Sequence, residues 1–270
     1  MTGVIFMDTL RRSWRTVLWW SLGVGSITAL QIVAIPDANA IRQIGELLES
    51  MPPAMLQLFG AGSDMSFYST PEGYLSLQFF GFILLVFAIY GIFAGLNITI
   101  NEEDRGIMDV VLSLPTPRWQ VVVERFAAYT VNVIVIVLVT FLFLWGGLLV
   151  TPALQVNMQR MVEGTINIVP GTLLTVAITM LLGVTVRRRG AAMTLAFVFV
   201  LGSYFLDTIG RSASESVINQ VRAISFFAYY NGENVIKNGL SLFDMTVLLG
   251  ATVIALVLSV FIFQRRDIGV

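Results

Sequence analysis

The sequence lacks the side chains on which most enzyme active sites depend. Its 270 residues include no Cys and no His, which removes thiolate nucleophiles, imidazole bases and the usual ligands of zinc, copper and haem sites. The single lysine, Lys237, lies between Ile236 and Asn238, so it does not belong to a Gly-Lys-Ser/Thr phosphate loop. We therefore expect no catalytic residue, no metal site and no cofactor bound by this chain.

The carboxylates offer little more chemistry. Asp104, Asp109 and Glu124 come closest to the acid and base groups that a membrane-embedded lipid enzyme would need near the headgroups. Of the six long apolar stretches described below, five contain no charged residue in their interiors and the other has only Asp207, near its end. Proton relays and ion-coupled carriers usually place ionisable groups at depth. The pattern disfavours a secondary transporter and an intramembrane protease.

Composition indicates a membrane protein. Hydrophobic residues make up 56% of the chain and charged residues only 12%, with a mean hydropathy of +0.82, whereas soluble domains have about 25% charged residues. The formal net charge of −1 provides no basic field for nucleic acid, which requires clustered Lys and Arg. The lipid bilayer is the expected surrounding, and nucleic acid is not an expected partner.

Six apolar stretches are long enough to cross a bilayer as helices, since one crossing needs about 20 residues. The sequence predicts an all-α integral membrane protein with one domain over residues 1–270. We place the spans at residues 16–36, 75–100, 126–150, 166–186, 190–209 and 245–264.

The distribution of basic residues predicts the orientation, because Lys and Arg of short loops stay on the cytoplasmic side. Six crossings with both termini cytoplasmic put 11 basic residues inside and 5 outside. We therefore expect a multi-pass protein of the cell membrane. The five outside are Arg42, Arg160, Arg211, Arg222 and Lys237.

The first 15 residues alternate between apolar and charged side chains. Val4, Ile5 and Leu10 oppose Asp8 and Arg11 in a pattern consistent with an amphipathic helix in the headgroup region. A simple charged anchor before the first span explains the same residues. Both interpretations remain open at this point.

Uncharged polar side chains inside the spans are candidates for a substrate path. Equally, such groups can hydrogen-bond between helices. Gly91 and Gly95 form a GxxxG pattern in the second span, which is typical of closely packed helices. The candidates for the path are Asn97, Asn132, Thr140, Thr175 and Thr179.

The segment between the second and third spans, residues 101–126, is longer and more charged than a turn requires. Its apolar residues recur at helical spacing and end at Pro115, which predicts a short cytoplasmic helix with an apolar stripe. A second helix should begin with Pro117 at its first position and continue into the third span. The stripe can face a protein partner or lie in lipid. It consists of Ile107, Met108, Val111, Leu112 and Leu114.

This segment resembles the coupling segment of permease subunits of ATP-binding-cassette (ABC) exporters of the type-2 class. In that family a Glu-rich helix end is followed by a pattern like G-x-x-x-x-L-L-S-L-P-x-x-R. The outer stretch S-T-P-E-G-Y-L-S at residues 69–76 and the ending F-Q-R-R-D-I at residues 263–268 are also similar to the family. The matching residues here are Glu102, Glu103, Gly106, Val110, Val111, Leu112, Ser113, Leu114, Pro115 and Arg118.

The resemblance implies a transport subunit that is driven by a separate ABC ATPase, present in two copies, which binds ATP and Mg. It also implies a second permease copy or a related permease, and export of a hydrophobic or amphiphilic substrate such as a drug, natural product, peptide or lipid. A membrane scaffold that recruits a soluble partner without transport is the alternative. The residues expected to couple to the ATPase are Glu102, Glu103, Gly106, Ile107, Met108, Asp109, Val111, Leu112, Leu114, Pro115 and Arg118.

Overall fold

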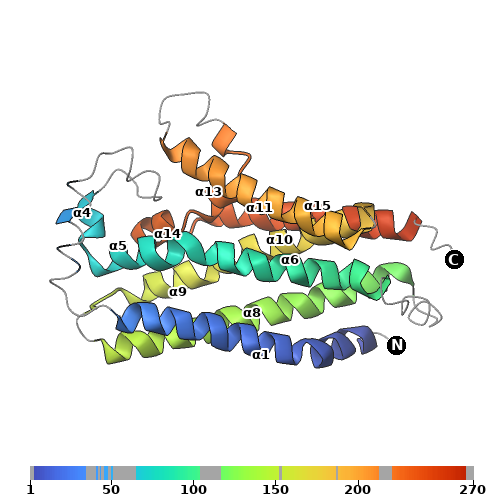
Figure 1. Ribbon diagram of the computed structural model, residues 1–270, viewed down its shortest axis with the longest axis horizontal. Helices are drawn as coiled ribbons and strands as arrows, with labels where there is room; N and C mark the ends of the chain where they lie inside the picture. The colour runs from blue at the N-terminus through green and yellow to red at the C-terminus, as the bar shows by residue number, and fades with distance from the viewer. Residues whose placement is uncertain are drawn as a thin grey trace.

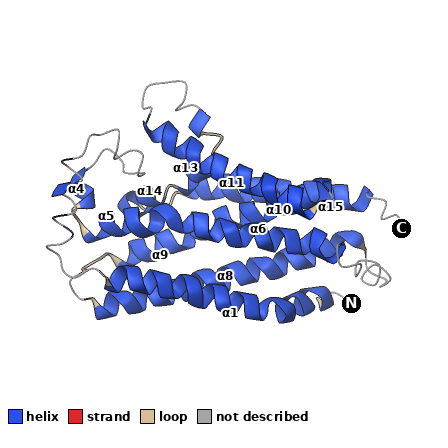
Figure 2. Cartoon of the chain, in the orientation of Figure 1, coloured by secondary structure: helices blue, strands red, loops and turns tan. Residues whose placement is uncertain are grey.

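The chain folds as a bundle of long helices (Figures 1 and 2). The computed structural model describes residues 3–34, 65–103, 117–151, 154–186, 188–212 and 221–265, with scattered residues between 41 and 50. Among them, six helical segments are long and apolar enough to cross a membrane, and no strand occurs. The predicted all-α membrane architecture is confirmed.

The spanning helices have the following bounds. The first span is α1 (Val4–Val33), the third is α8 (Arg118–Val150), the fifth is α11 (Arg189–Ser212) and the sixth is α15 (Leu242–Arg265). The second span begins with α5 (Pro71–Leu75), continues through the π-helical η1 (Ser76–Phe80) and becomes α6 (Gly81–Glu103). The fourth consists of α9 (Met158–Ile166) and α10 (Ile168–Val186). Among the described residues, three short helices lie outside these spans, namely α4 (Met65–Tyr68), α13 (Phe226–Tyr230) and α14 (Gly232–Asn238).

The helix starts differ from the sequence expectation in two places. The N-terminal segment is not a separate helix, because α1 runs without a break from Val4 into the first span. α1 has 30 residues and α8 has 33, and the two helices lie side by side (Figure 1). Like α1, α8 begins before its apolar stretch, at Arg118. Pro117 precedes α8 as its N-cap, with extended backbone at ψ 139°, instead of occupying the first helical position.

The centre of the bundle is the contact between α6 and α10. A Cβ atom added at Gly95 would lie 2.6 Å from the carbonyl oxygen of Val176 and 2.7 Å from the Cβ of Thr179. At Gly91 it would lie 3.1 Å from the Cβ of Thr175. The GxxxG pattern therefore marks the face on which these two helices approach each other most closely.

The segment before the last span folds back beside α11. Phe226 of α13 stacks on Phe199, ten residues into α11, with ring centroids 5.4 Å apart. Phe227 meets Tyr204 edge-on at 5.4 Å. The α13–α14 hairpin thus reaches down along the middle of a spanning helix and does not lie flat on the end of the bundle.

The start of α1 and the end of α15 lie at the same end of the bundle, as Figure 1 shows. The end of α6 and the start of α8 lie there too. This arrangement is the one required by an even number of crossings. We call this the terminal end and the opposite one the hairpin end.

Candidate functional site

At the terminal end, a buried arginine joins the second and third spans. Arg125 is 5% exposed, and its Nη1 donates to the carbonyl oxygen of Ile98 in α6 at 2.9 Å. A guanidinium is rarely buried without a specific acceptor, because its desolvation is costly. Arg125 therefore holds the start of α8 against the last turns of α6.

A carboxylate of α8 caps the first turn of α1. Glu124 accepts the backbone N–H of Gly3 at 2.9 Å and that of Phe6 at 3.1 Å, and Gln120 donates to the same carboxylate at 2.6 Å. The first N–H groups of a helix have no partner inside the helix, and a negative charge there is favourable. The sequence offered Glu124 as an acid–base candidate and gave no sign of these partners, which lie about 120 residues away. Its observed contacts are structural.

The predicted coupling segment begins directly beyond these contacts. Glu102 and Glu103 are the last residues of α6, and Arg118 is the first of α8. The other predicted coupling residues lie outside the described residues, namely Gly106, Ile107, Met108, Asp109, Val111, Leu112, Leu114 and Pro115.

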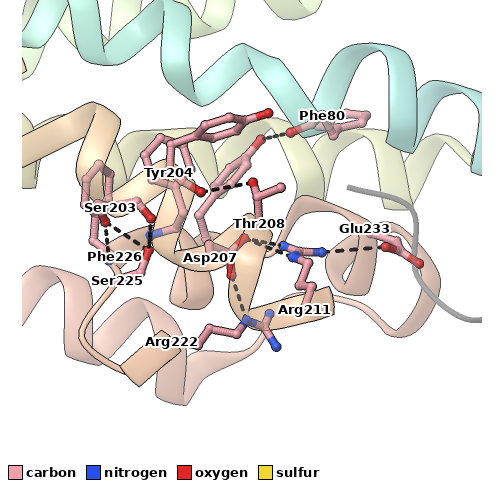
Figure 3. Close-up of polar contacts among 12 residues, drawn as sticks. Phe80, Ser203, Tyr204, Asp207, Thr208, Arg211, Arg222, Ser225, Phe226 and Glu233 are labelled. Carbon is pink, nitrogen blue, oxygen red and sulfur yellow. Dashed lines mark hydrogen bonds and ion pairs between the residues drawn. The ribbon is translucent and has the colours of Figure 1, made fainter. Parts of the chain in front are cut away.

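At the hairpin end, Asp207 is the centre of a buried ionic network (Figure 3). Its Oδ1 accepts from the Nε of Arg222 at 2.7 Å, and its Oδ2 accepts from the Nε of Arg211 at 2.9 Å. The Nη1 of Arg211 lies 3.7 Å from the Oε2 of Glu233 in α14. The network connects α11 with the segment that precedes α13 and with α14.

Tyr230 attaches the hairpin to the second span. Its hydroxyl donates to the carbonyl oxygen of Phe80 at 2.8 Å, at the point where the π-helical turn passes into α6. The side chain of Asn167 donates to the carbonyl oxygen of Tyr230.

A small hollow, open on one side, lies between these elements. It is bounded by the start of the second span, by α11 and by the hairpin, and we call it the outer hollow. Its walls combine aromatic rings with charged groups. The lining residues are Tyr68, Ser76, Leu77, Gly81, Phe82, Tyr204, Asp207, Thr208, Arg211, Phe227, Tyr230, Gly232 and Glu233.

A second small hollow, also open, lies between α1 and the second span. Two exposed amides, Gln31 and Gln78, line it among apolar side chains that include Ile83 and Val86. Phe82 lines both hollows and is 40% exposed. The two hollows therefore flank the same ridge of the second span.

Residues 7–268 match the family described as ABC-2 family transporter protein. The chain belongs to this family. The match covers nearly all of the sequence and makes the protein a membrane transport permease, of the kind that works with an ATPase subunit. Comparison with curated proteins gave no match.

The structure places the permease's five predicted path residues on α6, α8 and α10. Asn132 is 4% exposed and donates to the Oγ of Ser13 at 2.9 Å, joining α8 to α1. Thr140 and Thr175 donate to carbonyl oxygens one turn earlier in their own helices. Thr179 packs against Gly95, and Asn97 is half-buried on α6. None of the five lines either hollow, so the path stays a prediction.

Proposed function

We propose that this permease is the membrane subunit of an ATP-driven exporter and that residues 106–114 dock on a separate ATPase that binds ATP and Mg. The family membership supports a transport role. The contacts at the terminal end support this segment as the point of force transfer. Glu124 holds the start of α1 and Arg125 holds the end of α6, so a displacement of the segment would move three spanning helices together.

The substrate class that suits such a bundle is hydrophobic or amphiphilic, because the spans are almost free of charge except at the hairpin end. With both termini cytoplasmic, the hairpin end faces outward. Drugs, natural products, peptides and lipids all fit this description. Export then runs from the coupling segment towards the hairpin.

Leu112→Asp is expected to weaken the permease–ATPase complex at least about tenfold and to abolish stimulation of ATP hydrolysis, because it places a charge in the apolar stripe. Co-purification and ATPase assays of the reconstituted pair measure both effects. Asn238→Asp is the control, since it adds the same charge at an exposed position of α14, at the hairpin end, and should leave binding unchanged. Normal binding by the Leu112 variant would contradict the docking proposal and favour a scaffold that recruits its partner elsewhere.

We further propose that two copies of the chain pair through the face formed by α1 and the second span. The amides of Gln31 and Gln78 are exposed on spanning helices, and neither hydrogen-bonds to another residue that the structure describes. Amides on such helices are stabilised by hydrogen bonds to neighbouring helices. Phe82 and Phe93, 40% and 39% exposed, extend this face along α6. A two-fold axis here would bring the amides and the ridges of both copies together.

The absence of cysteine from the sequence makes this pairing directly testable. Phe82→Cys introduces a single thiol on the proposed face, and a bifunctional thiol reagent added to membranes should convert most of the variant to a covalent dimer. Ile254→Cys, on the exposed face of α15, is the control and should remain monomeric. Crosslinking of the control without crosslinking at position 82 would assign the dimer to another face.

A further inference from the structure

The charged end of the outer hollow presents one positive and one negative group that form an ion pair without a hydrogen bond between them. Both oxygens of Asp207 are occupied by arginines at 2.7 and 2.9 Å. Arg211 uses Nε and Nη2 for that contact and directs Nη1 at Glu233. The separation of 3.7 Å is too long for a hydrogen bond. A guanidinium edge and a carboxylate therefore face the hollow beside each other.

The rest of the wall is aromatic and apolar. The rings of Tyr68, Tyr204, Phe227 and Tyr230 line the interior, and three of these four residues are at most 3% exposed. Leu77 and Phe82 lead from the hollow onto the exposed ridge of the second span. Aromatic faces attract cations as well as apolar groups. The wall thus suits an apolar body with a charged head.

We propose that the outer hollow binds a dipolar amphiphile, with an ammonium group at Glu233, a phosphate or carboxylate oxygen at Nη1 of Arg211, and its apolar part against Leu77 and Tyr204. Each charged group of the ligand would make a charge-assisted hydrogen bond where the protein now has a long ion pair. The site does not depend on the ATPase or on export, because it is formed by one chain alone.

The charges also exclude simpler ligands. Asp207, Glu233, Arg211 and Arg222 sum to zero, so the site has no net attraction for an ion of either sign. A purely anionic head at Arg211 would be repelled by Glu233, and a purely cationic head would be repelled by Arg211. Only a ligand that carries both signs matches both groups, whether it is a membrane lipid or a free zwitterion.

The test uses two lipids that differ only in the ammonium group. Phosphatidylethanolamine carries it, whereas N-acetyl phosphatidylethanolamine retains the phosphate without it. Binding to the purified permease, followed by native mass spectrometry, should be about tenfold tighter for the first lipid. Glu233→Gln should remove the preference, and Glu233→Lys should reverse it in favour of the N-acetylated lipid. A reversal cannot result from misfolding.

Glu163→Gln is the control, because Glu163 is another carboxylate at the hairpin end, paired with Arg160 and absent from the hollow's lining. It should keep the wild-type preference. The dipeptide phenylalanyl-leucine with free termini tests the second source: displacement of phosphatidylethanolamine would identify a free zwitterion as a ligand, and no displacement would leave the lipid as the ligand. A wild-type protein that binds neither dipolar probe preferentially, or a Glu233→Gln variant that still discriminates, would overturn the proposal.

Discussion

Replacing Asp207 with alanine is expected to lower the free energy of unfolding by about 3 kcal/mol, because it leaves two partly buried guanidinium groups without their shared counter-ion. The Asp207 side chain is 8% exposed, and those of Arg211 and Arg222 are 18% and 25% exposed. This residual access to water puts the expected cost at the lower end of the range for breaking a buried pair. The effect is measured by unfolding the purified permease in mixed micelles at increasing concentrations of a denaturing detergent.

Asp8→Ala provides the comparison, since it also removes the carboxylate of an arginine pair. Asp8 bonds Arg12 at 2.8 Å, but the two side chains are 54% and 65% exposed. Exposed pairs of this kind contribute less than about 1 kcal/mol. Equal losses for the two variants would show that burial does not determine the strength of the Asp207 network.

The second large effect is expected from Gly95→Ala. The added methyl group would lie 2.6 Å from a carbonyl oxygen and 3.0 Å from a backbone nitrogen of α10, and backbone atoms cannot rotate away. The helices must separate, which we expect to cost about 2 to 3 kcal/mol. Because α6 and α10 form the most buried part of the bundle, transport should fall together with stability. Thermal unfolding and substrate export measure the two losses.

Gly250→Ala is the matched control, in the middle of α15. No heavy atom lies within 4 Å of the added methyl group, and alanine is the better helix former by about 1 kcal/mol. The control should therefore equal or exceed the wild type in stability. If Gly95→Ala behaves like this control, the close contact between α6 and α10 is not required.

The sequence was sufficient for features that depend on local composition. Apolar length predicted six spans, and six helical segments are long and apolar enough to cross a membrane, because a segment in lipid must satisfy its backbone hydrogen bonds internally. The third span ends with α8 at Val150, because Thr151 precedes Pro152 and the residue before a proline disfavours helical backbone. The GxxxG pattern also predicted close helix packing, although it could not identify α10 as the partner.

Other features depend on which helices become neighbours. Glu124 caps a helix that begins at Val4. Arg222 reaches Asp207 because the segment that leads into α13 lies beside α11. Nothing in the local sequence distinguishes these side chains from ordinary charged residues at a membrane boundary. Their partners lie 15 to about 120 residues away, and only packing brings them within hydrogen-bond distance.

The composition and apolar lengths alone therefore established that the chain is a helical membrane protein, and they show that it has no cysteine or histidine. The tertiary structure decided which helices are joined at one end and which charges meet in a hollow at the other. The physical reason is that hydrophobic length is a property of each segment, whereas a cap, an ion pair or a lined hollow exists only between segments.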